Sequence, residues 1–196
     1  MKSLNTLMTY IAAFTLLSSI GYAAPAEVTV SGQARFTSTA PLEKIVGTAP
    51  VQGQFSIDFE APKVVSGKFT VPVKGMKTGN ETRDEHLRGE EWLNAEKCES
   101  IVFEAKSGEV TKFQSAKESD KGITSIKLLV KGAITINCIT KPLEANVIIK
   151  RKGNITKIGS SSIEVKLADF DVKGKEGIVG KKVGETIKIN LNLKGK

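Results

Sequence analysis

The chain has 196 residues, with 29 Lys and Arg against 21 Asp and Glu, one histidine, one tryptophan and two cysteines. A single histidine and two separated cysteines fall short of the three or four ligands of a zinc site, and no nucleophile elbow accompanies the histidine. The lysines that give the net charge of +8 alternate with apolar residues along nearly every segment, which is typical of solvated strand faces. We therefore expect no catalytic residues, no metal or other cofactor, and no nucleic-acid partner.

Residues 1–23 are predicted to be a signal peptide. Lys2 precedes an apolar run over residues 7–20, and the small residues Gly21 and Ala23 suit a signal peptidase. The apolar run is shorter than the ~20 residues that cross a bilayer, which disfavours a membrane anchor. The sequence thus predicts export to the periplasm or the extracellular space.

Residues 24–196 are predicted to form one all-β domain. Apolar residues recur at every second position, as in half-buried strands, and turn signals separate the runs. Eight such runs begin at Val28, Val51, Phe69, Ile101, Ile126, Leu143, Ile163 and Ile187. Closing eight long strands into an antiparallel up-and-down barrel buries one face and leaves no free edge. We expect this eight-stranded barrel, and a two-sheet sandwich is the alternative.

A segment without strand periodicity lies between the third and fourth predicted strands. Thr82 followed by Glu85 fits a capping box, in which each residue satisfies a free amide of the first helical turn. A short helix is therefore predicted over residues 83–92, broken or bent at Gly89. It has few large apolar side chains, so we expect it to seat on the barrel as a lid or plug.

The two cysteines are expected to form a disulfide. If the strands on either side of Glu118 form an antiparallel hairpin, Cys98 and Cys138 pair, because each lies twenty positions from that tip. The same register places Phe103 opposite Ala133. In an oxidising compartment such a pair forms a covalent link; two independent buried thiols are the alternative.

The densest polar cluster is Arg83, Asp84, His86 and Arg88. In a functional interpretation, Arg83, His86 and Arg88 contact the polar head of a ligand, since guanidinium groups bind phosphate-like oxygens bidentately. In a structural interpretation, Asp84 pairs with Arg88 at helical spacing and His86 seats the helix. An enzyme that uses His86 with Asp84 is a third hypothesis.

The inward faces of the predicted strands form the second candidate site. Valine and isoleucine predominate there, and a closed barrel filled by small aliphatic residues leaves space for a slender ligand; an ordinary packed core is the alternative. The candidate lumen residues are Phe36, Phe55, Phe59, Phe69, Phe103, Leu128, Val130, Val147, Val165, Ile189 and Leu191.

Two stretches carry a resemblance to a known family. RDEHLRGEEWLNAEKCESIVFEA, which begins at Arg83, and GAITINCITKPLEANV, which begins at Gly132, resemble the two signature runs of the YceI-like family. The resemblance implies a lipocalin-like barrel in the periplasm that holds a polyisoprenoid, an isoprenoid quinone or a fatty-acyl lipid as a ligand rather than a cofactor. The connection between the first two strands lacks the histidine and aromatic residues of many members. The alternative is a non-enzymatic envelope protein whose basic surface binds a partner or an anionic membrane.

Overall fold

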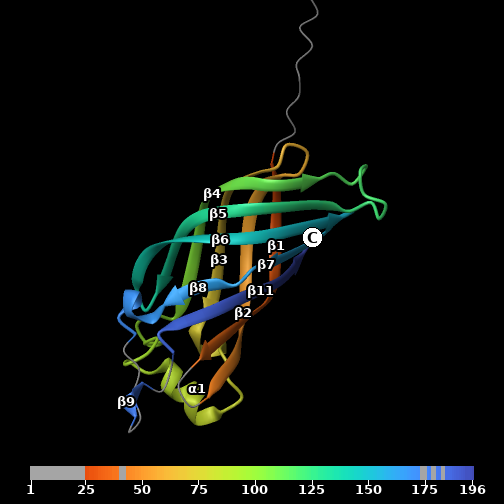
Figure 1. Ribbon diagram of the computed structural model, residues 1–196. Helices are drawn as coiled ribbons and strands as arrows, with labels where there is room; N and C mark the ends of the chain where they lie inside the picture. Colours follow the sequence, from red (N-terminus) through yellow and green to blue (C-terminus); the bar gives the residue numbers. More distant parts are fainter. Residues whose placement is uncertain (1–24, 40–42, 173–175, 178–179, 182–183) are drawn as a thin grey trace, which may run out of the picture.

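The predicted barrel is the architecture seen in the computed structural model (Figure 1). The structure describes residues 25–39, 43–172, 176–177, 180–181 and 184–196, so the predicted signal peptide lies outside the described residues. The strands of the barrel are β1 (Ala26–Thr39), β2 (Lys44–Asp58), β3 (Lys63–Pro72), β4 (Ser100–Gln114), β5 (Thr124–Ile136), β6 (Ile139–Lys152), β7 (Ile155–Ser160), β8 (Ile163–Lys166) and β11 (Thr186–Gly195). The other elements are the helix α1 (Glu81–Arg88), the 3-10 turns η1 (Val73–Gly75) and η2 (Leu167–Phe170), and the short pair β9 (Glu176–Gly177) and β10 (Gly180–Lys181).

Pairing between the first and last strands closes the sheet. Each strand from β1 to β6 pairs antiparallel with the next, β7 pairs with β11, and β11 pairs back to β1, from Val30 opposite Gly195 to Ser38 opposite Ile187. The result is a closed eight-stranded barrel, because β7 and β8 share one position beside β11. Closure through the β1–β11 pairing excludes the sandwich alternative, although β8 has β11 as its one ladder partner among the described strands.

The sequence pattern does not reveal β7. This strand pairs with the end of β11 at Asn192–Gly195, whereas β8 pairs with its beginning at Thr186–Ile189. The inner face of β7 carries Thr156, which is only 1% exposed, so polar and apolar residues do not alternate cleanly there. Because a polar residue occupies an inner position, hydrophobic periodicity does not identify this strand.

A single α-helix lies between β3 and β4 as predicted, but its first turn differs. The cap is Asn80, whose side-chain oxygen accepts a hydrogen bond from the Arg83 amide at 2.9 Å. Asn is a better N-cap than Thr, and the predicted Thr82–Glu85 capping box is therefore wrong because both residues lie inside the helix. The helix ends at Arg88, before Gly89, and does not continue to Trp92.

The disulfide prediction is confirmed, and the register from which it was inferred is off by one residue. Cys98 and Cys138 are joined, with their Cα atoms 5.5 Å apart. Phe103 pairs with Ile134, not with Ala133, and two irregularities interrupt the β4–β5 ladder further along. Cys98 precedes β4, and Cys138 lies in the tight turn between β5 and β6 with φ 58°, so neither cysteine is bound by the strand register.

Candidate functional site

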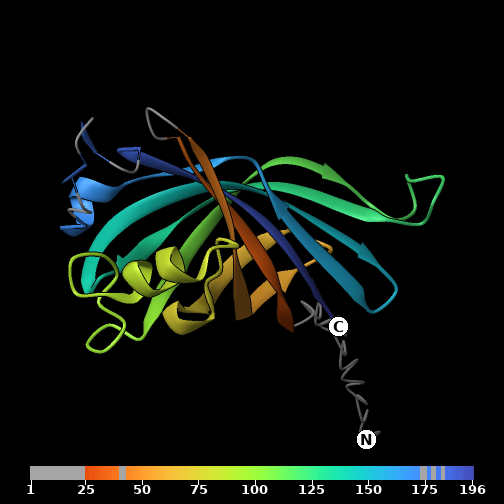
Figure 2. The same cartoon turned by 90° about the horizontal axis from the view of Figure 1, so that it is seen from below.

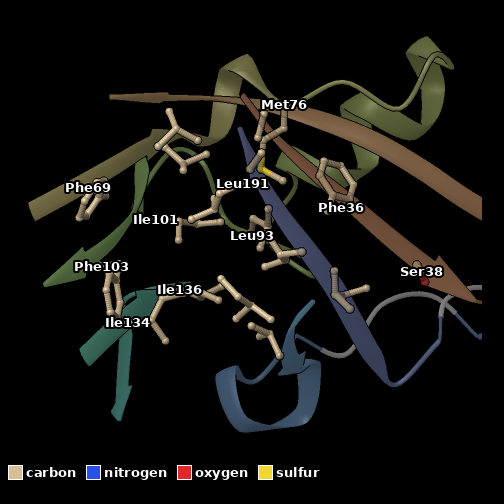
Figure 3. Close-up of a pocket in the computed structure, with 18 of the residues that line it drawn as sticks. Phe36, Ser38, Phe69, Met76, Leu93, Ile101, Phe103, Ile134, Ile136 and Leu191 are labelled. Atoms are coloured by element: carbon tan, nitrogen blue, oxygen red, sulfur yellow. The ribbon is translucent and has the colours of Figure 1, made fainter. Parts of the chain in front are cut away.

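The barrel contains a cavity of about 520 Å³ (Figure 3), and residues of α1 line part of its wall. Figure 2 shows α1 lying across one end of the barrel. Phe69 and Phe103 lie on one side of the cavity and Phe36 on the other, with Leu191 between them in the view of Figure 3. Nine of the eleven predicted lumen residues line this cavity: Phe36, Phe55, Phe69, Phe103, Val130, Val147, Val165, Ile189 and Leu191.

The other two predicted lumen residues lie elsewhere. Leu128 is buried in the core but is not part of the cavity wall. Phe59 follows the last residue of β2, and its ring packs under the Arg151 guanidinium, 4.2 Å from the ring centroid. Strand alternation cannot place Phe59 because the strand has already ended.

Two glycines of β2 keep the lumen open. Gly47 lies opposite Phe36 and Gly53 opposite Phe69 on the neighbouring strands. A side chain at either glycine would overlap the facing phenylalanine ring. Because these two positions carry no side chain, both phenylalanine rings lie directly on the backbone of β2 and leave more of the interior free. Phe69 also packs near Phe103, with ring centroids 6.4 Å apart, which extends this aromatic wall onto β4.

The segments outside the strands supply wall residues that the sequence pattern misses. Met76 follows η1, and Trp92 and Leu93 lie in the segment between α1 and β4. Leu93 is 5% exposed, and hydrogen bonds of this segment to Arg88 and Gly89 fold it back on the helix. These residues follow no strand or helix periodicity. The single tryptophan of the chain is the only sequence feature that points to this segment.

Polar groups gather at one end of the cavity. They come from the end of β1, the residue before β2 and the segment around the start of α1: Ser38, Glu43, Thr78, Asn80, Thr82, Arg83 and His86. The Arg83 guanidinium bridges the mouth, donating to Glu43 at 2.6 Å and to the Thr78 hydroxyl at 3.1 Å. The cavity is thus apolar along its length and polar at its mouth.

Of the three predicted head-group residues, the structure places two at the mouth. Arg83 and His86 line the cavity and Arg88 does not. The Nε of Arg88 and the indole N–H of Trp92 are buried without an acceptor among the described residues. An unsatisfied buried donor costs about 1–3 kcal/mol, so an acceptor at either group would be favourable. Of the two, only Trp92 belongs to the cavity wall.

Asp84 anchors α1, but not through the predicted pairing with Arg88. Its carboxylate accepts hydrogen bonds from the Thr78 amide at 2.7 Å and the Thr78 hydroxyl at 2.6 Å, and Lys77 Nζ lies 4.0 Å away. Burial would raise the pKa of Asp84, but these hydrogen bonds and the charges of Lys77 and Arg88 together hold that pKa below its ordinary value. The charged carboxylate therefore stabilises the fold.

Replacing Asp84 by alanine is expected to lower the free energy of unfolding by about 2–3 kcal/mol at neutral pH, because two donors of Thr78 lose a charged acceptor. Asp84→Asn, which keeps an oxygen but no charge, is the matched control. The folded pKa of Asp84 is depressed, so the stability due to its charge is present above the unfolded value of about 4 and is lost as pH falls through the folded pKa. Urea unfolding across this range measures it; a gap between parent and Asp84→Asn that stays constant into acid would refute the charge effect.

Metal-ligand groups and membrane-spanning helices were sought in the part of the chain that the structure describes. No group of three His, Cys, Asp or Glu side chains there could hold a metal ion. No helix in that part is long and apolar enough to cross a membrane.

Sequence comparison places most of the chain in one family. The profile of the family described as "YceI-like domain" matches residues 23–195. A UPF0312 protein of Photorhabdus laumondii is 28% identical over 130 residues, which cover 64% of this chain and 61% of the relative. A UPF0312 protein of Shewanella sp. W3-18-1 is 33% identical over 91 residues, which cover 46% of this chain and 41% of the relative. The matches thus span less than two thirds of the length of these curated relatives.

Solved structures share the fold at low sequence identity. Burkholderia cenocepacia BcnA superimposes with a TM-score of 0.66 at 15% identity, covering 87% of this chain and 96% of that one. A polyisoprenoid binding domain from Saccharophagus degradans gives a TM-score of 0.62 at 9% identity, with 88% and 98% coverage. At these identities the likeness establishes the fold alone.

Proposed function

The chain belongs to the YceI-like family, and from this premise we propose that it is a periplasmic carrier that holds one long-chain amphiphile in its barrel. The ligand class is a polyisoprenoid, an isoprenoid quinone or a fatty-acyl lipid. The solved relative from Saccharophagus degradans is a polyisoprenoid binding domain, which supports this class. The carrier acts without chemistry on its ligand.

The observation that carries the proposal is the polarity of the cavity. An enclosed volume of about 520 Å³ lies within the range of about 300–1,000 Å³ typical of small-molecule sites. Its wall is apolar and its polar groups lie at one end, which matches a molecule with a long apolar chain and one polar head. Burial of apolar surface at about 25 cal/mol per Å² is sufficient for micromolar binding or tighter.

The head of the ligand is proposed to lie at the mouth, near Arg83 and His86. Arg83 is already paired with Glu43, so the mouth offers hydrogen-bond donors without a large excess of positive charge. The indole N–H of Trp92 could donate to an oxygen of a ligand that reaches it. A head with hydroxyl or carbonyl oxygens suits this set of groups.

Two features support export. The predicted signal peptide directs the chain out of the cytoplasm. The Cys98–Cys138 disulfide suits an oxidising compartment such as the periplasm. Localisation is tested by fractionating the host cells and probing the periplasmic fraction.

Titration with an isoprenoid quinone is expected to quench the fluorescence of Trp92, saturating at one quinone per protein. Trp92 is the single tryptophan of the chain and lies in the cavity wall, so its emission reports on a quinone inside the barrel. A polyprenol or fatty acid, which does not quench, should restore the emission by displacing the quinone. Linear quenching without saturation, equal to that of free tryptophan, would contradict binding in the cavity.

A further inference from the structure

The outer surface carries a row of like charges at the start of β7. Lys150 of β6 lies directly opposite Lys157 of β7, and Lys157 lies directly opposite Lys194 of β11. All three side chains are exposed. Side chains directly opposite on neighbouring strands are about 5 Å apart at Cβ, and like charges at such positions destabilise a sheet.

Serines, and not acidic residues, flank this row of lysines. Among the described residues, none of the three lysines forms an ion pair. The residues opposite the two ends of the row are Ser125 on β5 and Ser31 on β1. Three other lysines of the outer wall are paired with an acidic residue: Lys68 with Glu104, Lys131 with Glu144 and Lys188 with Glu164. The row is thus a run of three neighbouring strands on which like charges lie side by side without an acidic partner among the described residues.

An exposed apolar side chain adjoins the row. Ile155 is 37% exposed, and with Phe113 it is one of two exposed large apolar residues among those described. It lies on the outer face of β7, two residues from Lys157, and opposite the exposed Lys152 of β6. Lysines around an exposed isoleucine combine electrostatic attraction to anionic head groups with a side chain that can enter the head-group region.

We infer that this surface, formed by Lys150, Lys152, Ile155, Lys157 and Lys194 and here named the lysine patch, docks the protein on an anionic lipid bilayer. The charge complementarity is to lipid phosphates, and the exposed isoleucine beside the lysine row favours a bilayer over a soluble polyanion. The patch carries no aromatic residue to stack on bases, as single-stranded nucleic acids require.

The patch lies at a distance from the cavity mouth. Cys138 ties the β5–β6 turn to the segment that follows α1, and β6 runs from that turn to the lysine patch at its other end. Figure 1 shows the β6–β7 turn away from α1. Docking through the lysine patch therefore leaves the mouth uncovered, and the inference does not rest on what the cavity binds.

Cosedimentation with vesicles tests the inference. Vesicles of equal parts phosphatidylglycerol and phosphatidylcholine should bind the full chain at low ionic strength, and vesicles of phosphatidylcholine alone should not. Replacing Lys150, Lys157 and Lys194 together by glutamine should weaken binding on the order of a hundredfold, since each lysine near an anionic surface contributes about fivefold. About 1 M salt, where the Debye length is about 3 Å, should abolish it.

The matched control replaces the paired lysines Lys68, Lys131 and Lys188 by glutamine, which changes the net charge equally. Retained binding by this control, with circular dichroism unchanged in both variants, supports the lysine patch. An equal loss of vesicle binding in both variants would mean that net charge alone determines binding, and would overturn the inference. It is also overturned if phosphatidylglycerol vesicles do not bind, or if a DNA duplex binds the patch more tightly than they do.

Discussion

Replacing Val130 or Val147 by tryptophan is expected to abolish binding of a long-chain ligand while the barrel remains folded. Both valines line the cavity, Val130 from β5 and Val147 from β6, where Val130 is opposite Ala145. An indole at either position projects into the space that the ligand chain needs. Overpacking a full core typically costs about 1–3 kcal/mol, but here the cavity of about 520 Å³ can receive the added volume. If each variant removes about 3 kcal/mol of binding energy, the affinity for the ligand should fall about a hundredfold.

Binding is measured by displacement of a fluorescent fatty acid. This readout does not depend on the emission of the tryptophan that each variant adds. Asn146→Trp is the matched control, because Asn146 neighbours Val147 but is exposed on the outer face of β6. It adds the same side chain outside the barrel and should bind as the parent does. Unchanged binding by both lumen variants would mean that the ligand does not occupy the cavity.

Removing the disulfide, as Cys98→Ala with Cys138→Ser, is expected to lower the free energy of unfolding by about 3–4 kcal/mol. The link closes a loop across a sequence separation of 40 residues, which restricts the unfolded chain. In a chain of this size the melting temperature should fall by about 10 °C. The disulfide also holds the segment that carries Trp92 and Leu93, so release of a bound ligand should become faster.

Thermal unfolding with and without dithiothreitol provides the comparison. Reductant should bring the parent protein down to the stability of the double variant and leave the variant itself unchanged. A variant that melts with the parent under oxidising conditions would show that packing of Leu93 and Ala95, both buried, already fixes the segment without the covalent link.

The regular part of the fold follows from the sequence because strand periodicity is a local property. Inward positions such as Val30, Phe55 and Ile126 alternate with polar neighbours and are all buried. Periodicity fails where a polar residue occupies an inner position, as Thr156 does in β7, or where a strand ends, as β2 does before Phe59. Neither case is visible without knowing which strands meet.

The candidate site was predictable for its strand residues and not for its mouth. The lumen residues follow from alternation, whereas Met76 and Leu93 reach the cavity through irregular segments that only the folded chain positions. The Arg83–Glu43 pair joins residues 40 positions apart, and no local rule pairs them. The disulfide was predictable because both cysteines lie at the ends of one hairpin, even though its register is shifted by one residue.

The most direct test of the carrier proposal is native mass spectrometry of the protein purified from its own host, followed by solvent extraction of the bound material. The proposal predicts one lipid-sized adduct per chain, and the extract should contain a polyisoprenoid, an isoprenoid quinone or a fatty-acyl lipid. A mass equal to that of the processed chain alone, unchanged after incubation with quinones, polyprenols and fatty acids, would contradict it.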